Sequence, residues 1–248
     1  MNRLTGKVAI VTGASQGMGE AHARMMVAEG AKVIMTDINE DAGQALATEL
    51  GENTLFIKQN VASAADWKKV VEQGEAAFGI INVLVNNAGV IGPVSNMSDL
   101  SADAFNKVCD VNQLGVFLGM QAVLPSMERA GVGSVINVSS IAGIIAAYGA
   151  PNIAYVASKF AVRGMTKQIA VEYGSKNIRA NSVHPGFIKT PMMAAATDEG
   201  GGEATSMIPL SRMAEPSEVS SLIVFLASDE SSFITGTEQI IDGGMVCH

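Results

Sequence analysis

The chain has 248 residues, of which 48% are hydrophobic and 16% are charged, and this composition excludes a disordered protein. The net charge is −8, from 24 acidic and 16 basic residues, so a nucleic-acid partner is not expected, because phosphate backbones need clustered Lys and Arg. No apolar stretch approaches the roughly 20 residues of a membrane span, and no membrane association is expected.

The two cysteines, Cys109 and Cys247, are too few for a disulfide framework, and no Cys/His cluster predicts a metal site. The apolar run at residues 8–11 is too short for the core of a signal peptide. We therefore expect a cytoplasmic protein without a metal ion.

Short apolar runs alternate with longer stretches of helical periodicity. In chain order we expect a strand at 7–12, a helix at 17–29, a strand at 32–36, a helix at 39–50, a strand at 55–59, a helix at 64–78, a strand at 81–85, a helix at 101–128, a strand at 134–138, a helix at 153–173, a strand at 178–183, a helix at 215–227 and a strand at 238–241. This alternation predicts an α/β fold with a doubly wound, about seven-stranded parallel sheet and helices on both faces. No linker divides the chain, so residues 1–248 are expected to form one domain.

Residues 191–212 interrupt the alternation. They hold short Met- or Ala-rich helical pieces around the triple glycine at 200–202. Three glycines are costly inside a helix, so we expect a mobile flap here, beside the carboxyl ends of the strands. The alternative is a surface loop that closes nothing.

Three glycines follow the first predicted strand. Gly13, Gly17 and Gly19 stand where a strand passes into a helix. Glycine there allows a tight turn, close approach of the backbone to a pyrophosphate and close packing of helix on sheet. The sequence therefore predicts a dinucleotide site at this turn, on an NAD(P)-binding domain.

Asp37 lies at the end of the second strand. A carboxylate at this place can accept hydrogen bonds from the adenosine ribose and would repel a 2′-phosphate. No Lys or Arg stands at Ser15, Gln16 or Ile38 to bind such a phosphate. We therefore expect NAD(H) as the cofactor, against the alternative that Asp37 only caps the helix beginning near Asn39.

The glycine spacing after Thr12 resembles the TGxxxGxG pattern of the classical short-chain dehydrogenase/reductase family. Four further segments extend the resemblance over almost the whole chain: Asn86-Asn87-Ala88-Gly89, Asn137-Val138-Ser139-Ser140, Tyr155-Val156-Ala157-Ser158-Lys159, and Pro185-Gly186 with Thr190. The resemblance implies a Rossmann-type fold and an oxidoreductase that interconverts a secondary alcohol and a ketone.

Tyr155 and Lys159 are four residues apart and share one helix face. A free tyrosine, with a pKa of about 10, is poorly matched to acid–base chemistry at neutral pH, and a nearby cation lowers that pKa. Ser140, at the end of a neighbouring strand, can hold the substrate oxygen. The resemblance implies that Tyr155 is the general acid/base, that Lys159 also binds the nicotinamide ribose, and that Asn112 holds a water in a proton relay.

The resemblance also implies where the cofactor lies. The residues expected to contact it are Gly13, Ser15, Gln16, Gly17, Met18, Gly19, Asp37, Ile38, Asn60, Val61, Asn87, Ala88, Gly89, Tyr155, Lys159, Pro185, Gly186, Ile188 and Thr190. Many family members carry Asp where this chain has Asn60, so an adenine contact by Asn60 is a weaker expectation.

The stretch from Ser140 to Tyr155 is about two residues longer than is usual in the family. It contains Tyr148, which has Asn152 rather than Lys four residues on, so we reject Tyr148 as the catalytic tyrosine. We expect a substrate pocket formed by Ser140 and Tyr155 together with Ile144, Tyr148, Met192 and Met193, suited to bulky apolar ketones. The alternative is that the extra residues bulge into solvent or a subunit contact.

Three further alternatives stay open. His184 precedes Pro185-Gly186 and is interpreted as a structural histidine rather than a general base. An NADPH-dependent 3-oxoacyl-carrier-protein reductase would want a basic residue near Gln16 or Ile38, and a non-catalytic dinucleotide-binding regulator would have lost Tyr155, Lys159 or Ser140. The resemblance implies a homotetramer.

Overall fold

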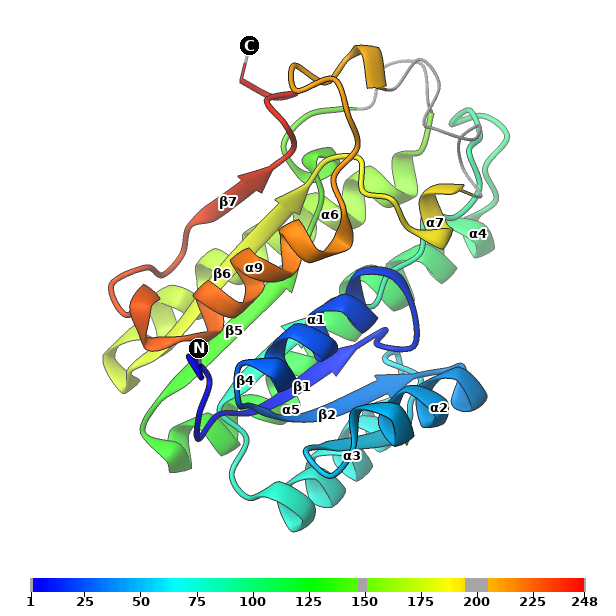
Figure 1. The fold of residues 1–248 in the computed structure, drawn as a ribbon. Coiled ribbons are helices and arrows are strands. Elements are labelled where there is room, and N and C mark those ends of the chain that lie inside the picture. Colours follow the sequence, from blue (N-terminus) through cyan, green and yellow to red (C-terminus); the bar gives the residue numbers. More distant parts are fainter. Residues whose placement is uncertain (1, 147–150, 195–204, 248) are drawn as a thin grey trace.

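The computed structural model of the chain describes residues 2–146, 151–194 and 205–247 (Figure 1). Its sheet has seven strands in the order β3-β2-β1-β4-β5-β6-β7, each parallel to its neighbours. The strands are β1 Val8–Thr12, β2 Lys32–Asp37, β3 Thr54–Lys58, β4 Val83–Asn86, β5 Gly133–Val138, β6 Ile178–Pro185 and β7 Glu238–Ile241. The predicted parallel α/β sheet is confirmed.

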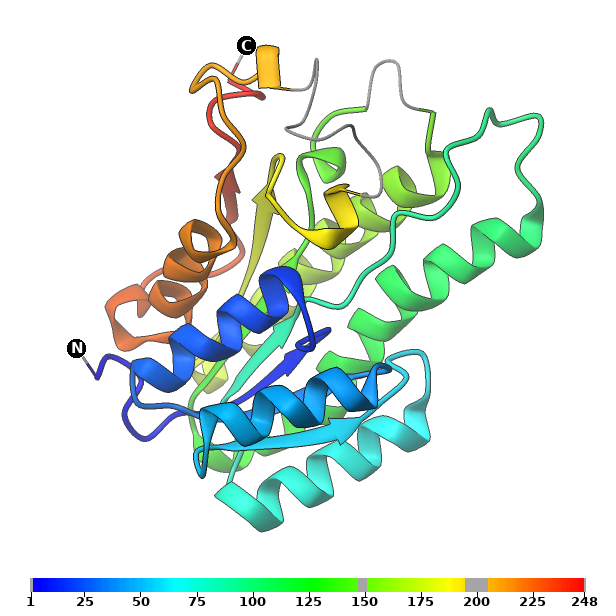
Figure 2. The same cartoon turned by 45° about the vertical axis from the view of Figure 1, so that its right-hand side comes forward.

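Helices cover both faces of the sheet (Figures 1 and 2). They are α1 Gly17–Ala28, α2 Glu40–Leu50, α3 Ala64–Phe78, α4 Ala102–Cys109, α5 Gly115–Ala130, α6 Ile153–Tyr173, α7 Pro191–Ala194 and α9 Pro216–Ala227. One hydrophobic core lies between the sheet and α1, α2 and α9, and a second lies between the opposite face and α3, α5 and α6. Every residue of β1 and β4 is buried, because both of their faces are covered, and this explains their unbroken apolar sequences.

The strand order reverses between β1 and β4. From β1 the chain steps to β2 and β3 on one side, and from β4 it steps to β5, β6 and β7 on the other. In an open parallel sheet this reversal leaves a crevice beyond the carboxyl ends of the two central strands. The segments that follow β1 and β4 therefore face each other across the expected ligand site.

Polar side chains fix several helix starts where the sequence predicts them. Asn39 accepts a hydrogen bond from the Ala42 N–H at 3.2 Å and caps α2. Glu215 and Glu218 form a reciprocal capping box around Pro216 at the start of α9. The predicted bounds of α3, α6 and β7 agree with the structure.

The predicted helix 101–128 is divided in the structure. Residues Asp110–Leu114 form a π-helical segment between α4 and α5. Such segments are rare and are frequent at functional sites. This one contains Asn112, whose side chain is fully buried.

Part of the predicted flap lies outside the described residues, which include only its two ends. Helix α7 occupies one end, and a parallel bridge pairs Ile188 with Ala214 close to the other. Within the described ranges, no helix is long and apolar enough to cross a membrane. The same ranges contain no group of three or more His, Cys, Asp or Glu residues placed to hold a metal ion.

Candidate active site

The glycine-rich turn between β1 and α1 adopts backbone conformations that glycine favours. Gly13 has φ +64° and Gly17 has φ +60°, both in the left-handed region. A Cβ atom at Gly19 would lie 2.0 Å from the Gly13 carbonyl oxygen, so no other residue fits there. The turn brings the N-terminus of α1 to the crevice, where its free N–H groups and dipole favour a phosphate.

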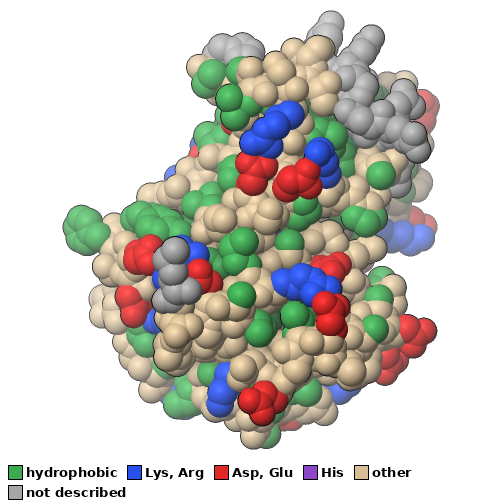
Figure 3. All heavy atoms as spheres, in the orientation of Figure 1, with side chains coloured by type: hydrophobic (Ala, Val, Ile, Leu, Met, Phe, Trp, Pro, Cys, Tyr) green, Lys and Arg blue, Asp and Glu red, His purple; other side chains and the backbone are tan. Residues whose placement is uncertain are grey.

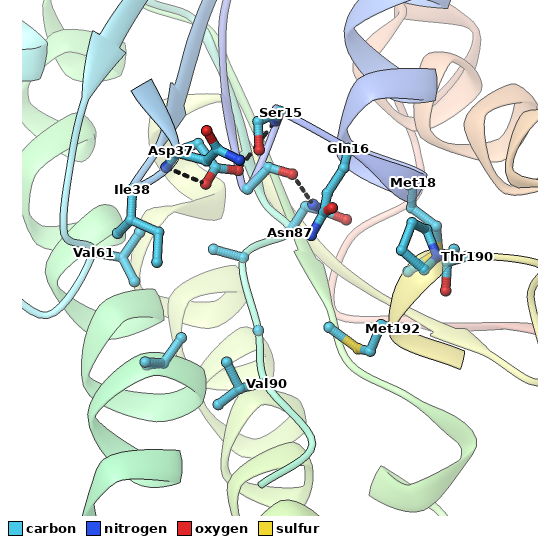
Figure 4. Close-up of a pocket in the computed structure, with 18 of the residues that line it drawn as sticks. Ser15, Gln16, Met18, Asp37, Ile38, Val61, Asn87, Val90, Thr190 and Met192 are labelled. Carbon is cyan, nitrogen blue, oxygen red and sulfur yellow. Dashed lines mark hydrogen bonds between the residues drawn. The ribbon is translucent and has the colours of Figure 1, made fainter. Parts of the chain in front are cut away.

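A cleft of about 400 Å³ opens at this turn (Figure 4). Its lining comes from the β1–α1 turn with the start of α1, the residues at the ends of β2 and β3, the segment after β4, the π-helical segment and the start of α7. The residues are Gly13, Ser15, Gln16, Gly17, Met18, Gly19, Asp37, Ile38, Asn39, Gln59, Asn60, Val61, Asn87, Ala88, Gly89, Val90, Val111, Thr190, Pro191 and Met192. Most of the residues predicted to contact the cofactor are therefore brought together in one cleft.

Asp37 is held at one end of the cleft by two main-chain donors. Its Oδ2 accepts from the Ser15 N–H at 3.1 Å, and its Oδ1 accepts from the Asn39 N–H at 3.0 Å (Figure 4). Each oxygen has a further lone pair for a ligand hydroxyl. None of the described residues lining the cleft is Lys or Arg.

Asn87 joins the segment after β4 to the turn after β1. Its Nδ2 donates to the Thr12 carbonyl at 2.9 Å, and the Thr12 hydroxyl accepts from the Asn87 and Ala88 N–H groups at 3.0 Å. Asn87 Oδ1 and both polar atoms of the Gln59 side chain are buried without a partner among the described residues. Unpaired buried polar atoms are costly, so their presence in the cleft lining fits a polar ligand such as a dinucleotide.

Lys159 connects α6 to the end of β5 through a hydrogen bond. The Lys159 side chain is 4% exposed, and its Nζ donates to the Val138 carbonyl at 2.9 Å. The same Nζ lies 5.5 Å from the centre of the Tyr155 ring. A Cβ atom at Gly89 would lie 3.5 Å from this Nζ, which places Lys159 next to the cleft lining.

The pKa values of the pair are set mainly by burial. Burial lowers the pKa of Lys159 to about 8. Burial also raises the pKa of Tyr155, and the opposing hydrogen bond with Ser140 is the weaker influence. In the chain alone the pKa of Tyr155 is therefore raised, because desolvation disfavours the charged phenolate.

Asn112 fastens the loop after Gly89 through both ends of its amide. Its Oδ1 accepts from the Val90 N–H and its Nδ2 donates to the Val90 carbonyl, both at 2.8 Å. Its Nδ2 also donates to the Ser158 hydroxyl at 3.1 Å. The π-helical segment thus places Asn112 between the cleft and α6.

The two serines at the end of β5 point to different partners. The Ser139 hydroxyl donates to the Lys159 carbonyl at 2.9 Å, whereas Ser140 is the serine that bonds Tyr155. The predicted alternation of their side chains agrees with this arrangement. His184 is fully buried, as a structural histidine would be.

Comparison with known proteins identifies the family. A family model described as enoyl-(acyl carrier protein) reductase matches residues 13–246. A 3-alpha-(or 20-beta)-hydroxysteroid dehydrogenase of Mycobacterium tuberculosis is 47% identical over 98% of this chain and 91% of its own length. A trans-4-hydroxycyclohexanecarboxylate dehydrogenase of Sinomonas cyclohexanicum is 45% identical over 98% of this chain and 94% of its own length. A crystal structure of a short-chain type dehydrogenase/reductase from Mycobacterium marinum is 35% identical, covers 99% of this chain and 97% of that one, and has a TM-score of 0.94.

The chain belongs to the short-chain dehydrogenase/reductase family. It is therefore an oxidoreductase that belongs with the alcohol dehydrogenases of this family. The curated relatives do not favour the 3-oxoacyl-carrier-protein reductase alternative.

Apolar side chains are exposed on several segments that follow the carboxyl ends of the strands or lead into α6. Ile144 and Met193 are half-buried and Met192 is exposed, whereas Tyr148 lies outside the described residues. We define the apolar rim by its exposed members among the described residues: Val94, Met97, Ile145, Ile153, Met192, Met207 and Leu210. The loop bearing Val94 is fixed to this region, because the Ser95 N–H donates to the Pro151 carbonyl at 2.9 Å.

The residues that line the cleft differ in part from those predicted to contact the cofactor. Asn39, Gln59, Val90, Val111 and Pro191 line the cleft but were not predicted to do so; each is a direct chain neighbour of a predicted residue or motif, and adjacency was the signal available. Five predicted cofactor residues are not among the residues that line it: Tyr155, Lys159, Pro185, Gly186 and Ile188. The Ile188 side chain instead packs into the core on the α1 and α9 side.

Proposed function

We propose that this chain interconverts bulky, apolar secondary alcohols and their ketones with NAD(H). The proposal rests on the group formed by Ser140, Tyr155 and Lys159. Lys159 of this group lies next to Gly89 in the lining of the cleft. An acid–base group, a hydroxyl that can hold an oxygen and a buried cation are the parts that carbonyl reduction requires from the protein.

The bound nicotinamide supplies or accepts the hydride. In reduction, the Tyr155 hydroxyl gives its proton to the carbonyl oxygen, and in oxidation the phenolate takes the proton of the alcohol. The Ser140 hydroxyl holds that oxygen in either direction. Lys159, with its positive charge buried beside the ring, favours the phenolate as the proton leaves.

Asn112 is a positioning residue for the loop that follows Gly89. Its amide nitrogen donates to the Val90 carbonyl and the Ser158 hydroxyl, and its oxygen accepts from the Val90 N–H. One lone pair of Oδ1 is left for the water of the expected proton relay. The bonds to Val90 fix the loop next to Gly89, where the cofactor lies.

Preference for NAD(H) rests on Asp37. The two main-chain bonds hold its carboxylate at the cleft, so ribose hydroxyls can donate to it. A 2′-phosphate would face this carboxylate without a Lys or Arg among the described lining residues. Repulsion of the competing cofactor and attraction of the correct one then act together.

The substrate class rests on the apolar rim. Its members come from the loop after β4, the segment around α6 and the described ends of the flap region. Exposed apolar side chains on segments near a cleft favour an apolar ligand, because covering them removes apolar surface from water. Relatives named for hydroxysteroid and hydroxycyclohexanecarboxylate substrates support a ring-bearing alcohol. A non-catalytic regulator is not supported, because Ser140, Tyr155 and Lys159 are all present.

A panel of alcohols tests the proposal. The purified chain is assayed with cyclohexanol, a 3α-hydroxysteroid, acetoin and a sugar alcohol, each with NAD and with NADP. We expect kcat/KM to be about 10–200-fold higher for the ring alcohols than for the small polar ones, the range that lost packing typically costs. Equal values across the panel would overturn the substrate class, and faster turnover with NADP would overturn the cofactor.

A further inference from the structure

β5 and β6 end side by side. Ser140 stands two residues after the last residue of β5, and His184 is the last residue but one of β6. Their register pairs Val138 with Val183, and the Ser139 N–H donates to the Val183 carbonyl at 2.8 Å. The next donor from β6 in a parallel ladder is residue 185, but Pro185 has no N–H. The backbone ladder therefore stops just where the active-site serine begins.

A side chain continues the connection that the backbone cannot make. His184 Nδ1 lies 2.9 Å from the Ser140 carbonyl oxygen, and its Nε2 lies 2.8 Å from the Ser182 hydroxyl. A carbonyl only accepts, so Nδ1 carries the proton and Nε2 accepts from Ser182. Both ring nitrogens of this fully buried histidine are thereby engaged.

Burial keeps this ring neutral. It lowers the pKa of His184 more than any other influence, the bond to Ser140 and the charge of Glu238 oppose it, and Arg163 and Lys159 add to it. A neutral ring with an acceptor at Nε2 has one tautomer available. The donor at Nδ1 is therefore fixed in place.

Three successive residues at the end of β5 are each held by a side-chain hydrogen bond. Lys159 Nζ donates to the Val138 carbonyl, and the Ser139 hydroxyl donates to the Lys159 carbonyl. Ser140 is held from the other side, by His184. The Ser140 hydroxyl also accepts from the Ala142 N–H at 3.1 Å, which orients it at the start of the next turn.

We infer that His184 is a positioning residue that sets the place of the Ser140 hydroxyl by holding the Ser140 carbonyl across the gap left by Pro185. It is not a general base, because both nitrogens are occupied away from the cleft lining. The inference rests on the proposed part of Ser140 in the reaction. A misplacement of about 1 Å at a reacting group can cost about 10²-fold in rate, so the bond has a measurable consequence.

Two amide substitutions distinguish a positioning function of His184 from a merely structural one. In His184→Asn the amide nitrogen takes the place of Nδ1 and can still donate to Ser140, whereas in His184→Gln it takes the place of Nε2 and cannot. We expect His184→Gln to lower kcat about tenfold to a hundredfold and His184→Asn to stay within about threefold of the wild type. The NADH dissociation constant, from fluorescence titration, should change in neither variant. Wild-type kcat in His184→Gln, or an equal loss in two folded variants, would overturn the inference.

A spectroscopic measurement reads the protonation of the ring in the wild-type protein itself. The chain has three histidines, and the imidazole nitrogen signals of His184 are those absent from the His184→Asn spectrum. We expect Nδ1 to be protonated in the wild type, and a proton on Nε2 would overturn the inference. Ser140→Ala distinguishes the proposed function of Ser140 from the positioning function of His184. If Ser140→Ala keeps its kcat, the proposed function of Ser140 is wrong. If Ser140→Ala loses activity and His184→Gln does not, only the positioning function of His184 is wrong.

Discussion

Lys159 is a cation placed where burial works against its charge. The side chain is 4% exposed, and its pKa is lowered to about 8 by desolvation. The Val138 carbonyl offsets part of this cost by accepting from Nζ. The fold therefore keeps a charged group beside Tyr155 at the expense of stability, as many active sites do.

Removing the charge should stabilise the fold. The folded-state pKa of Lys159, about 8, lies below the usual value of 10.5, so the destabilisation is full below pH 8 and fades as the pH rises toward 10.5. We expect Lys159→Met to raise the free energy of unfolding by up to about 3 kcal/mol at pH 7 while activity is lost. Urea unfolding of both proteins at pH 7 and pH 10 checks this. A gain that is equal at both pH values would contradict the burial account.

Asp37 is expected to carry the choice of cofactor. Asp37→Ala removes the acceptor for the ribose and the repulsion of a 2′-phosphate together. The ratio of kcat/KM with NADH to that with NADPH should fall by about tenfold or more, because a hydrogen bond to a charged group is worth about 1.5–3 kcal/mol. Asp41→Ala, which removes an exposed carboxylate from the first turn of α2, is the matched control and should leave the ratio unchanged.

Single residues were predictable from the sequence where a motif fixes the chemistry. Asp37, Tyr155 and Lys159 follow from their spacing and their places on expected elements. The unpartnered amide of Gln59 did not, because strand periodicity tells which face a side chain takes but not whether it finds a hydrogen-bond partner. The balance of burial and charge at Tyr155 also needed the packed structure.

At the scale of elements, Asn152 joins two walls of the site. Its Oδ1 accepts from the Tyr155 N–H at 3.1 Å and caps α6, while its Nδ2 donates to the Ile91 carbonyl at 2.9 Å. One side chain thus fixes the start of α6 and the loop that carries Val94 and Met97.

Two substitutions of Asn152 separate these contacts. Asn152→Ser keeps a capping oxygen but loses the donor to Ile91, so it should leave stability nearly unchanged and raise KM for bulky alcohols. Asn152→Ala loses both and should lower the free energy of unfolding by about 1 kcal/mol as well. Denaturant unfolding and KM for a ring alcohol check the pair. An unchanged KM in both variants would show that the loop does not shape the substrate site.

Most elements were predictable because their apolar periodicity and their caps agree. The strands of the buried sheet are apolar runs bounded by glycine or polar residues, and Asn39 marks the start of α2 in the sequence. The division of helix 101–128 was not predictable, because a π-helical segment has no composition of its own and is held here by bonds from Asn112 to a distant loop.

At the scale of the whole molecule, many surface charges are paired with charges of opposite sign. On the face shown in Figure 3, Lys and Arg side chains lie next to Asp and Glu rather than gathering alone. Ion pairs such as Arg24–Glu49 at 2.6 Å and Arg212–Glu218 at 2.7 Å belong to this pattern. Apolar side chains are exposed on α5 and α6, at Phe117, Phe160 and Val171.

We propose that these helices join subunits in a homotetramer, the assembly that the family resemblance implies. Light scattering should give a mass of four times the 25.7 kDa of one chain. Phe117→Glu together with Phe160→Glu should lower that mass, because buried charges without partners are costly in an interface. A wild-type mass equal to one chain would contradict this proposal.

The central claim is that Tyr155 exchanges the proton and that its hydroxyl contributes little to cofactor binding. Stopped-flow assay of Tyr155→Phe alongside NADH titration tests this claim most directly. We expect kcat to fall by about 10²–10⁴-fold, the usual contribution of general acid–base catalysis, with the NADH dissociation constant nearly unchanged. Tyr173→Phe, at the far end of the same helix, is the control and should keep wild-type kcat. A Tyr155→Phe variant that kept more than about a tenth of the wild-type kcat would contradict the account.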